Sequence, residues 1–186
     1  MAQEGSSLEA AQKVVDRLES SLPMGDKNYR KHYELANAYY DLGELQKASA
    51  RYQRVLVINP NFSKAMVNLG TCLSDQGKFE DGVEWLEKAL GIDPDDCKAR
   101  SNLGNVYYSM DRFPDAMYEY KRAIQSDPKC YSAHFNIAVA FADAGIFREA
   151  VKWWGEVVRL APGTDAGRQA AENIELIKPF IGGSLN

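Results

Sequence analysis

Amide side chains recur at a fixed spacing along the chain. Asn68, Asn102 and Asn136 stand 34 residues apart, and each directly precedes an apolar Leu or Ile. Asn105 follows Asn102 by three residues, and Asn37 follows by three residues the position that lies 34 residues before Asn68. On a helix, residues three apart lie on the same face, so these asparagines share one face. An amide offers a donor and an acceptor, which is the complement of a peptide bond. A ladder of such amides is expected to bind the backbone of an extended peptide with modest selectivity for its side chains.

Basic residues recur at the same period. Arg30, Lys64 and Lys98 begin three successive segments of the repeat. A cation at a helix N-terminus opposes the helix dipole by about 0.3–1 kcal/mol, so local helix stability does not explain the series. We interpret the three residues as a basic rim, aided by helix N-termini, that receives an acidic side chain or a terminal carboxylate. The alternative is that they pair with neighbouring acids.

Tyrosines and aspartates lie toward the other end of these segments. Tyr40 and Tyr108 are expected one turn further along the ligand-facing side, where they either contact a ligand side chain or serve as ordinary interface residues. Asp41, Asp75 and Asp143 lie near the segment ends, and the simpler interpretation of these aspartates is that they cap turns.

The elements that position these residues are set by a 34-residue repeat. Its period is marked by four prolines, Pro60, Pro94, Pro128 and Pro162. The chain then divides into four units, repeats one to four, spanning residues 29–62, 63–96, 97–130 and 131–164. A self-similar unit of this length with two helical patterns is typical of a helix-turn-helix solenoid.

Each unit contains two helical patterns separated by a turn. In the first pattern, Leu35 is followed by the small Ala36, and the other three units repeat this pairing. In the second pattern, a small residue such as Ala48 precedes a large one such as Tyr52 by four positions. Small residues facing large ones allow two antiparallel helices to interdigitate. The turns hold Gly43, Gly77 and Gly145, where a positive φ would end the first helix, and Asp111 takes that place in repeat three.

These columns resemble the tetratricopeptide repeat family. The family pattern of Leu-Gly, Tyr, Ala, an aromatic residue, Ala and Pro occurs here in four consecutive copies over residues 29–164. The resemblance implies an all-α, right-handed superhelical solenoid of antiparallel helix pairs whose first helices line a concave groove. The early tryptophan of the family is absent, and its column holds His32, Met66, Arg100 and His134. We expect His32, His134 and Met66 to be packing residues rather than ligands.

Both ends of the array are expected to carry a covering helix. Within residues 1–28, a short disordered start precedes an amphipathic helix at about residues 7–22. Residues 165–178 resemble the solvating helix that closes such arrays, and residues 179–186 form a tail without clear structure. Exposed ends of a stack need covers because each unit buries its apolar face only against its neighbours.

Composition limits the function classes. The net charge of −4 argues against nucleic acid as a partner, and no stretch has the length of a membrane span, so we expect a cytoplasmic protein. Three cysteines without Cys-x-x-Cys spacing indicate free thiols rather than a disulfide framework or a zinc site. No group of residues resembles a catalytic site, so no enzymatic activity, metal or cofactor is expected.

The sequence therefore predicts a non-catalytic interaction scaffold or adaptor that binds an extended peptide or partner segment in its groove. An alternative is an assembly subunit that self-associates through stack ends or its convex face, with Trp154 packed and Trp153 facing outward.

A third alternative is suggested by family members that clamp the C-terminal carboxylate of heat-shock chaperones. Asn37, Asn68 and Lys98 match their clamp, but Tyr33 and Asn102 replace two of its cations. Chaperone-tail binding is therefore the less favoured hypothesis.

Overall fold

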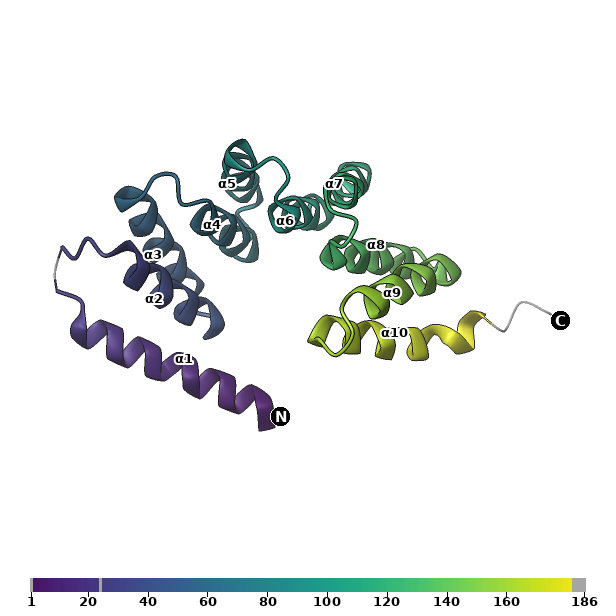
Figure 1. The fold of residues 1–186 in the computed structure, drawn as a ribbon, viewed down its shortest axis with the longest axis horizontal. Coiled ribbons are helices and arrows are strands. Elements are labelled where there is room, and N and C mark those ends of the chain that lie inside the picture. Colours follow the sequence, from purple (N-terminus) through teal and green to yellow (C-terminus); the bar gives the residue numbers. More distant parts are fainter. Residues whose placement is uncertain (1, 24, 182–186) are drawn as a thin grey trace. The chain divides into compact units, whose positions relative to one another are not determined.

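The computed structural model describes residues 2–23 and 25–181, with side chains from residue 8 onward. The described residues form ten α-helices and no strand, which confirms the predicted all-α fold (Figure 1). The helices are α1 (Ala2–Ser21), α2 (Tyr29–Asp41), α3 (Leu45–Ile58), α4 (Ser63–Asp75), α5 (Phe79–Ile92), α6 (Cys97–Ser109), α7 (Phe113–Ser126), α8 (Tyr131–Asp143), α9 (Phe147–Leu160) and α10 (Asp165–Ile181). No helix among them is both long enough and apolar enough to cross a membrane.

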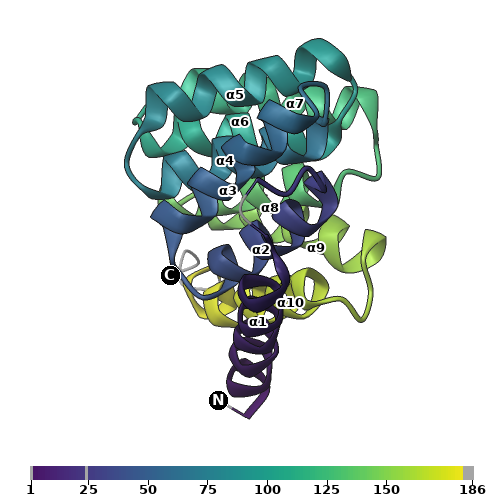
Figure 2. The ribbon, with the colours of Figure 1, turned by 90° about the vertical axis from the view of Figure 1, so that its left-hand side faces the viewer.

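The helices group into two compact units. Unit 1 comprises residues 1–94 and contains α1 to α5, and unit 2 comprises residues 95–186 and contains α6 to α10. Within each unit the two helices of every repeat pack as an antiparallel pair, as Figures 1 and 2 show for α4 with α5 and for α8 with α9. In unit 1, α1 packs on α2; in unit 2, α10 packs on α9 and contacts α8.

The helix pairs interlock through small residues that face large ones, as the columns predict. A Cβ atom on Gly70 of α4 would lie 2.7 Å from the Leu86 side chain and 2.9 Å from the Gly82 carbonyl oxygen of α5. Gly104 of α6 faces Tyr120 of α7 in the same way. Leu86 and Tyr120 are fully buried, so this close approach forms the core of each pair.

The turns between paired helices adopt the predicted left-handed conformation. Gly77 has φ +78°, and its counterpart in repeat three, Asp111, has φ 58°. Asp111 is the one described residue other than glycine with a positive φ. Aspartate tolerates this region better than most side chains, so the turn keeps its geometry without glycine.

The end helices are longer than expected. Helix α1 begins at Ala2, so it includes residues that we expected to be disordered. Of the five residues predicted to form its apolar stripe, Ala11, Val15 and Leu18 are buried, Leu22 is half-buried and Leu8 is 48% exposed. Helix α10 continues through Pro179 to Ile181; the proline lies in the last turn, so the hydrogen bond that it removes and its clash with the preceding turn affect only the helix end. The rest of the expected tail, residues 182–186, lies outside the described residues.

The prediction that all three cysteines are free thiols is wrong for two of them. Cys97 and Cys130 form a disulfide with their Cα atoms 5.9 Å apart. Cys97 begins α6 and Cys130 is the N-cap of α8, and the repeat places the starts of these two first helices side by side. The spacing of 33 residues was therefore the signal. Cys72 is free and buried, and burial raises the pKa of its thiol.

Reduction of this disulfide is expected to destabilise unit 2. The bond closes a loop over a separation of 33 residues, and such a crosslink stabilises by about 3–4 kcal/mol in the chain-entropy model. Urea unfolding with and without dithiothreitol measures the effect. The variant Cys97→Ser/Cys130→Ser serves as control and should not respond to the reductant. A wild-type curve that reductant leaves unchanged would contradict the assignment.

Candidate functional site

In unit 1 the amides of the predicted ladder bond to their own fold. Asn68 Nδ2 on α4 donates to the Tyr33 hydroxyl at 2.9 Å and to Asn37 Oδ1 at 3.1 Å, both on α2. Asn37 Oδ1 also accepts from the Tyr52 hydroxyl of α3 at 2.7 Å. Burial raises the pKa of Tyr33 and of Tyr52, so both hydroxyls stay protonated; that of Tyr52 donates to Asn37, whereas that of Tyr33 accepts from Asn68. This network joins repeat one to repeat two.

Unit 2 repeats part of this network and omits the rest. The Tyr120 hydroxyl donates to Asn105 Oδ1 at 2.8 Å, as Tyr52 does to Asn37. However, Ser101 stands where unit 1 has Tyr33, and it is buried against Cys130 and Ser132. Within the described part of the chain, no hydrogen bond engages the side-chain amide of Asn136, the counterpart of Asn68. The exchange of a tyrosine for a serine thus leaves this amide uncommitted.

Two recesses meet at Asn105 and Asn136. The smaller, about 220 Å³, is also lined by Tyr108, Tyr120 and Val139. The larger, about 380 Å³, lies between α6, α8 and α10. It is lined by Asn102, Asn105, Tyr131, Ser132, Phe135, Asn136, Asp165, Ala166 and Gln169. We call the surface formed by Asn102, Asn105 and Asn136 the amide face of unit 2.

The predicted tyrosines are committed to bonds between repeats. The Tyr40 hydroxyl donates to Asp75 Oδ2 at 2.6 Å, and the Tyr108 hydroxyl donates to Asp143 Oδ2 at 2.6 Å. Burial and this bond raise the pKa of Tyr108 to about 12, and the same causes raise that of Tyr40. In both bonds the tyrosine and the aspartate are 35 residues apart in the sequence, and this spacing could have predicted the contact. The bonds give Asp75 and Asp143 a structural role beyond closing turns.

The predicted basic rim is exposed. Arg30, Lys64 and Lys98 all extend into solvent at the starts of α2, α4 and α6. At α6 the Asp96 side chain caps the helix and accepts from the backbone N–H of Lys98 at 2.9 Å, and Asn28 caps α2 in the same way. The N-terminal donors that we expected to assist anion binding are therefore partly occupied at two of the three helices. Helix α4 has no side-chain cap.

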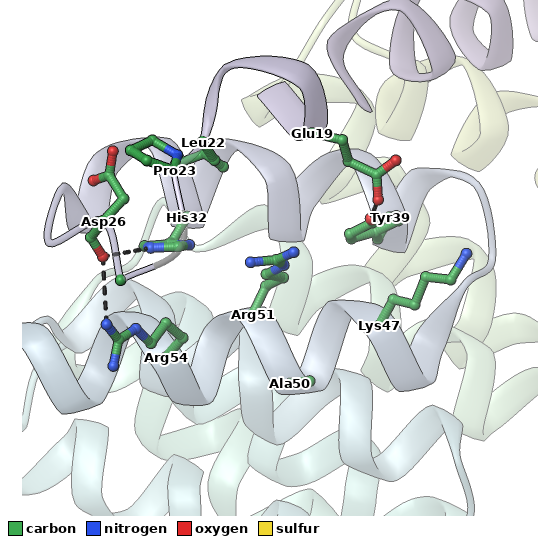
Figure 3. Close-up of a pocket in the computed structure, with 11 residues that line it drawn as sticks. Glu19, Leu22, Pro23, Asp26, His32, Tyr39, Lys47, Ala50, Arg51 and Arg54 are labelled. Atoms are coloured by element: carbon green, nitrogen blue, oxygen red, sulfur yellow. Dashed lines mark hydrogen bonds between the residues drawn. The ribbon is translucent and has the colours of Figure 1, made fainter. Parts of the chain in front are cut away.

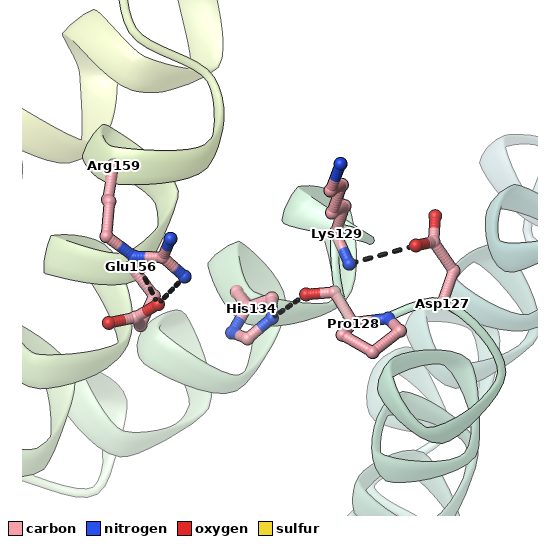
Figure 4. A network of polar contacts seen from close by, with 6 residues as sticks. All are labelled: Asp127, Pro128, Lys129, His134, Glu156 and Arg159. Atoms are coloured by element: carbon pink, nitrogen blue, oxygen red, sulfur yellow. Dashed lines mark hydrogen bonds and ion pairs between the residues drawn. The ribbon is translucent and has the colours of Figure 1, made fainter.

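The column that replaces the family tryptophan is buried. His32 Nε2 lies 3.0 Å from the Asp26 carbonyl oxygen (Figure 3), and His134 Nε2 lies 3.2 Å from that of Pro128 (Figure 4). Arg100 forms an ion pair with Glu119 at 3.0 Å. Burial confirms the packing role of His32, Met66 and His134, which are all less than 8% exposed, and Arg100 is 4% exposed. The described residues contain no group of three or more His, Cys, Asp or Glu arranged to hold a metal ion.

The two adjacent tryptophans of α9 differ from expectation in one case. Trp154 is buried, as predicted. Trp153 was expected to face outward, but its ring packs on His134 with centroids 5.4 Å apart. The prediction is wrong because a histidine in place of the larger family tryptophan leaves room for a second ring. Trp153 therefore does not mark an exposed contact surface.

Comparison with known proteins agrees with the fold. Two family models match the chain, one described as tetratricopeptide repeat over residues 33–96 and one as TPR repeat over residues 104–145. Together they span more than half of the sequence. The chain belongs to the tetratricopeptide repeat family, whose members act as protein-interaction modules. No curated protein sequence matches it.

Solved structures of MamA share this fold. A crystal structure of MamA has a TM-score of 0.61 and 21% identity, with 89% of each chain covered. The segment from residue 41 to the end of MamA from Desulfovibrio magneticus RS-1 has a TM-score of 0.67 and 19% identity, over 88% of this chain and 94% of that one. A structure of MamA from AMB-1 has a TM-score of 0.64 and 22% identity, with 88% of this chain and 98% of that chain covered. At these identities the likeness concerns the fold alone.

Replacement of Tyr108 by Phe tests the tyrosine–aspartate bond. Y108F is expected to lower the free energy of unfolding by about 1 kcal/mol at neutral pH, because it removes a hydrogen bond to a carboxylate. Unfolded tyrosine ionises near pH 10, whereas folded Tyr108 stays protonated to about 12. This stabilisation is therefore complete below about pH 10 and lost as the pH rises to about 12.

Urea unfolding of wild type and Y108F across this pH range measures the difference. Tyr118→Phe is the matched control, because Tyr118 lies on α7 of the same unit and is exposed. The stability gap between wild type and Y108F should narrow above about pH 10. A gap that stays constant would contradict the assigned role of the Tyr108 hydroxyl.

Proposed function

We propose that this protein is a non-catalytic scaffold or adaptor that binds an extended peptide segment over the amide face of unit 2. The observation that carries the proposal is the uncommitted amide of Asn136 at the junction of two recesses. Its donor and acceptor match one peptide unit of a ligand backbone. Asn102 and Asn105 lie on the neighbouring helix α6 and extend the polar surface.

The two recesses fit the geometry of an extended ligand. In an extended chain, alternate side chains point to the same side and lie about 6.5 Å apart. Recesses of about 220 and 380 Å³ would each take one such side chain. Phe135 and Tyr131 give the larger recess apolar walls, and Lys98 at the start of α6 is exposed to meet an acidic side chain or a terminal carboxylate.

The other predicted residues differ in which of their groups a ligand can contact. In unit 1, Asn37 and Asn68 bond to each other, so peptide contact there would fall to Arg30, Lys64 and other exposed side chains. The same bond disfavours the chaperone-tail hypothesis, since its clamp would need both amides. Tyr40 and Tyr108 would offer a ligand their rings, because their hydroxyls are already bonded.

Self-association remains the second candidate function. One observation favours it: Leu176 and Phe180 on α10 are 69% and 66% exposed, and they lie four residues apart on one helix face. An apolar pair on the helix that covers repeat four is a surface through which copies of a stack could meet. The amide face is the stronger candidate because its polar groups match a specific ligand chemistry.

Substitution of Asn136 tests the proposal. The ligand is selected from a displayed library of unstructured peptides, and its affinity is then measured by titration calorimetry. N136A is expected to weaken binding about tenfold, because it removes a donor and an acceptor from the interface. Its thermal stability should stay close to that of wild type, since this side chain holds no other element in place.

The matched control is Asn68→Ala, the same column in unit 1. N68A is expected to lower the free energy of unfolding by about 1–2 kcal/mol, because it breaks bonds to Tyr33 and Asn37. It should leave peptide affinity unchanged. If N136A and wild type bind the peptide with equal affinity, the proposal that the amide face binds it is wrong.

A further inference from the structure

Unit 1 contains a second recess, away from the amide side chains of α2 and α4. It has a volume of about 820 Å³ and lies between α1, α2 and α3 (Figure 3). Its polar lining includes three basic residues of α3, namely Lys47, Arg51 and Arg54, together with His32 and Tyr39 of α2. Apolar contact comes from Leu22, Pro23 and Ala50. Neither the repeat pattern nor the proposed peptide site accounts for this surface.

The three basic residues lie on one face of α3. Their spacing of four and then three residues places them one above the other on the helix. Figure 3 shows Lys47 and Arg51 extending from α3 into the recess, with Arg51 between His32 and Tyr39. The chain as a whole has more acidic than basic residues and a net charge of −4, so this basic cluster does not reflect its overall composition.

Two acidic residues, Glu19 and Asp26, also line the recess, and each carboxylate accepts a hydrogen bond from a neutral donor. Glu19 accepts from the Tyr39 hydroxyl, and the Asp26 carboxylate accepts from the Asn28 backbone N–H at 2.5 Å. Glu44 lies 3.5 Å from Lys47. Among the described residues, neither Arg51 nor Arg54 forms an ion pair. The one hydrogen bond of the Arg54 guanidinium is long, 3.4 Å to the Asp26 carbonyl oxygen. Among the lining residues three cations face two carboxylates, so the recess carries a small excess of positive charge.

In repeats three and four the two side chains at the equivalent positions contact each other. Where repeat one has His32 and Arg51, repeat three has the ion pair Arg100–Glu119, and repeat four has the ring contact of His134 with Trp153. In repeat one the equivalent positions hold His32 and Arg51, two side chains that join each other neither by an ion pair nor by a contact between two rings. His32 is 4% exposed, and its Nδ1 atom has no hydrogen-bond partner.

We propose that this recess binds a small soluble molecule that carries a phosphate group. Arg51 and Arg54 hold the phosphate, since guanidinium groups match its oxygens in paired hydrogen bonds. Lys47 adds charge, and His32 lines the recess beside these residues. The volume exceeds what phosphate alone requires and falls in the range of small-molecule sites, so Leu22, Pro23 and Ala50 contact the organic part. This site is independent of the amide face.

Titration calorimetry with defined probes tests the proposal. The probes are adenosine 5′-monophosphate, glucose 6-phosphate and inorganic phosphate, and adenosine is the uncharged control. At least one organic phosphate is expected to bind wild type more tightly than inorganic phosphate, and adenosine should not bind. R51Q and R54Q should each weaken that binding about 10- to 100-fold, through loss of charge-assisted hydrogen bonds.

The matched control variant is Arg122→Gln. Arg122 is the counterpart of Arg54 in repeat three and is exposed, so R122Q should bind the organic phosphate as wild type does. Circular dichroism melting verifies that R51Q and R54Q remain folded. The proposal is overturned if no organic phosphate binds at submillimolar concentration, or if R51Q binds as wild type does. It is also overturned if only vesicles of phosphatidic acid and phosphatidylcholine bind, because that result would indicate a membrane surface.

Discussion

The structure depends on one packing constraint: a helix pair can bury its apolar face only against the next pair. Close contact within a pair requires small residues such as Gly70 and Gly104 opposite large ones, and the 34-residue spacing repeats that contact. Once the register is fixed, positions of one repeat meet positions of the next repeat in the same unit 34 or 35 residues away. The bonds Tyr40–Asp75 and Tyr108–Asp143 are two instances of the same contact.

Both proposed binding sites lie where a position keeps its place in the register but changes its partner. Asn68 and Asn136 are equivalent, yet Asn68 is bonded to Tyr33, whereas the serine at position 101 leaves Asn136 available. In the tryptophan column, repeat three pairs Arg100 with Glu119, whereas repeat one combines His32 with Arg51. Both proposed binding sites therefore follow from incomplete networks, one polar and one ionic.

The sequence predicted what the register determines. The helix pairs, the turns at Gly77 and Asp111 and the buried columns at Leu35 and Tyr52 were all expected and are found. It did not predict features that depend on which side chain meets which across repeats. The disulfide between Cys97 and Cys130, the inward packing of Trp153 and the bonds of Asn68 all belong to that class. Aligning the repeats shows which residue types recur at one position of the repeat. Each of these contacts joins two different positions of the repeat, so the alignment does not show it.

The central claim is that equivalent amides have different hydrogen-bonding states, and side-chain NMR tests it most directly. Exchange of the Nδ2 protons with water can be measured for both residues in the free protein. The account predicts that Asn68 is protected and Asn136 exchanges rapidly, with only the Asn136 resonances shifting on addition of a bound peptide. Protection of Asn136 equal to that of Asn68 in the free protein would contradict it.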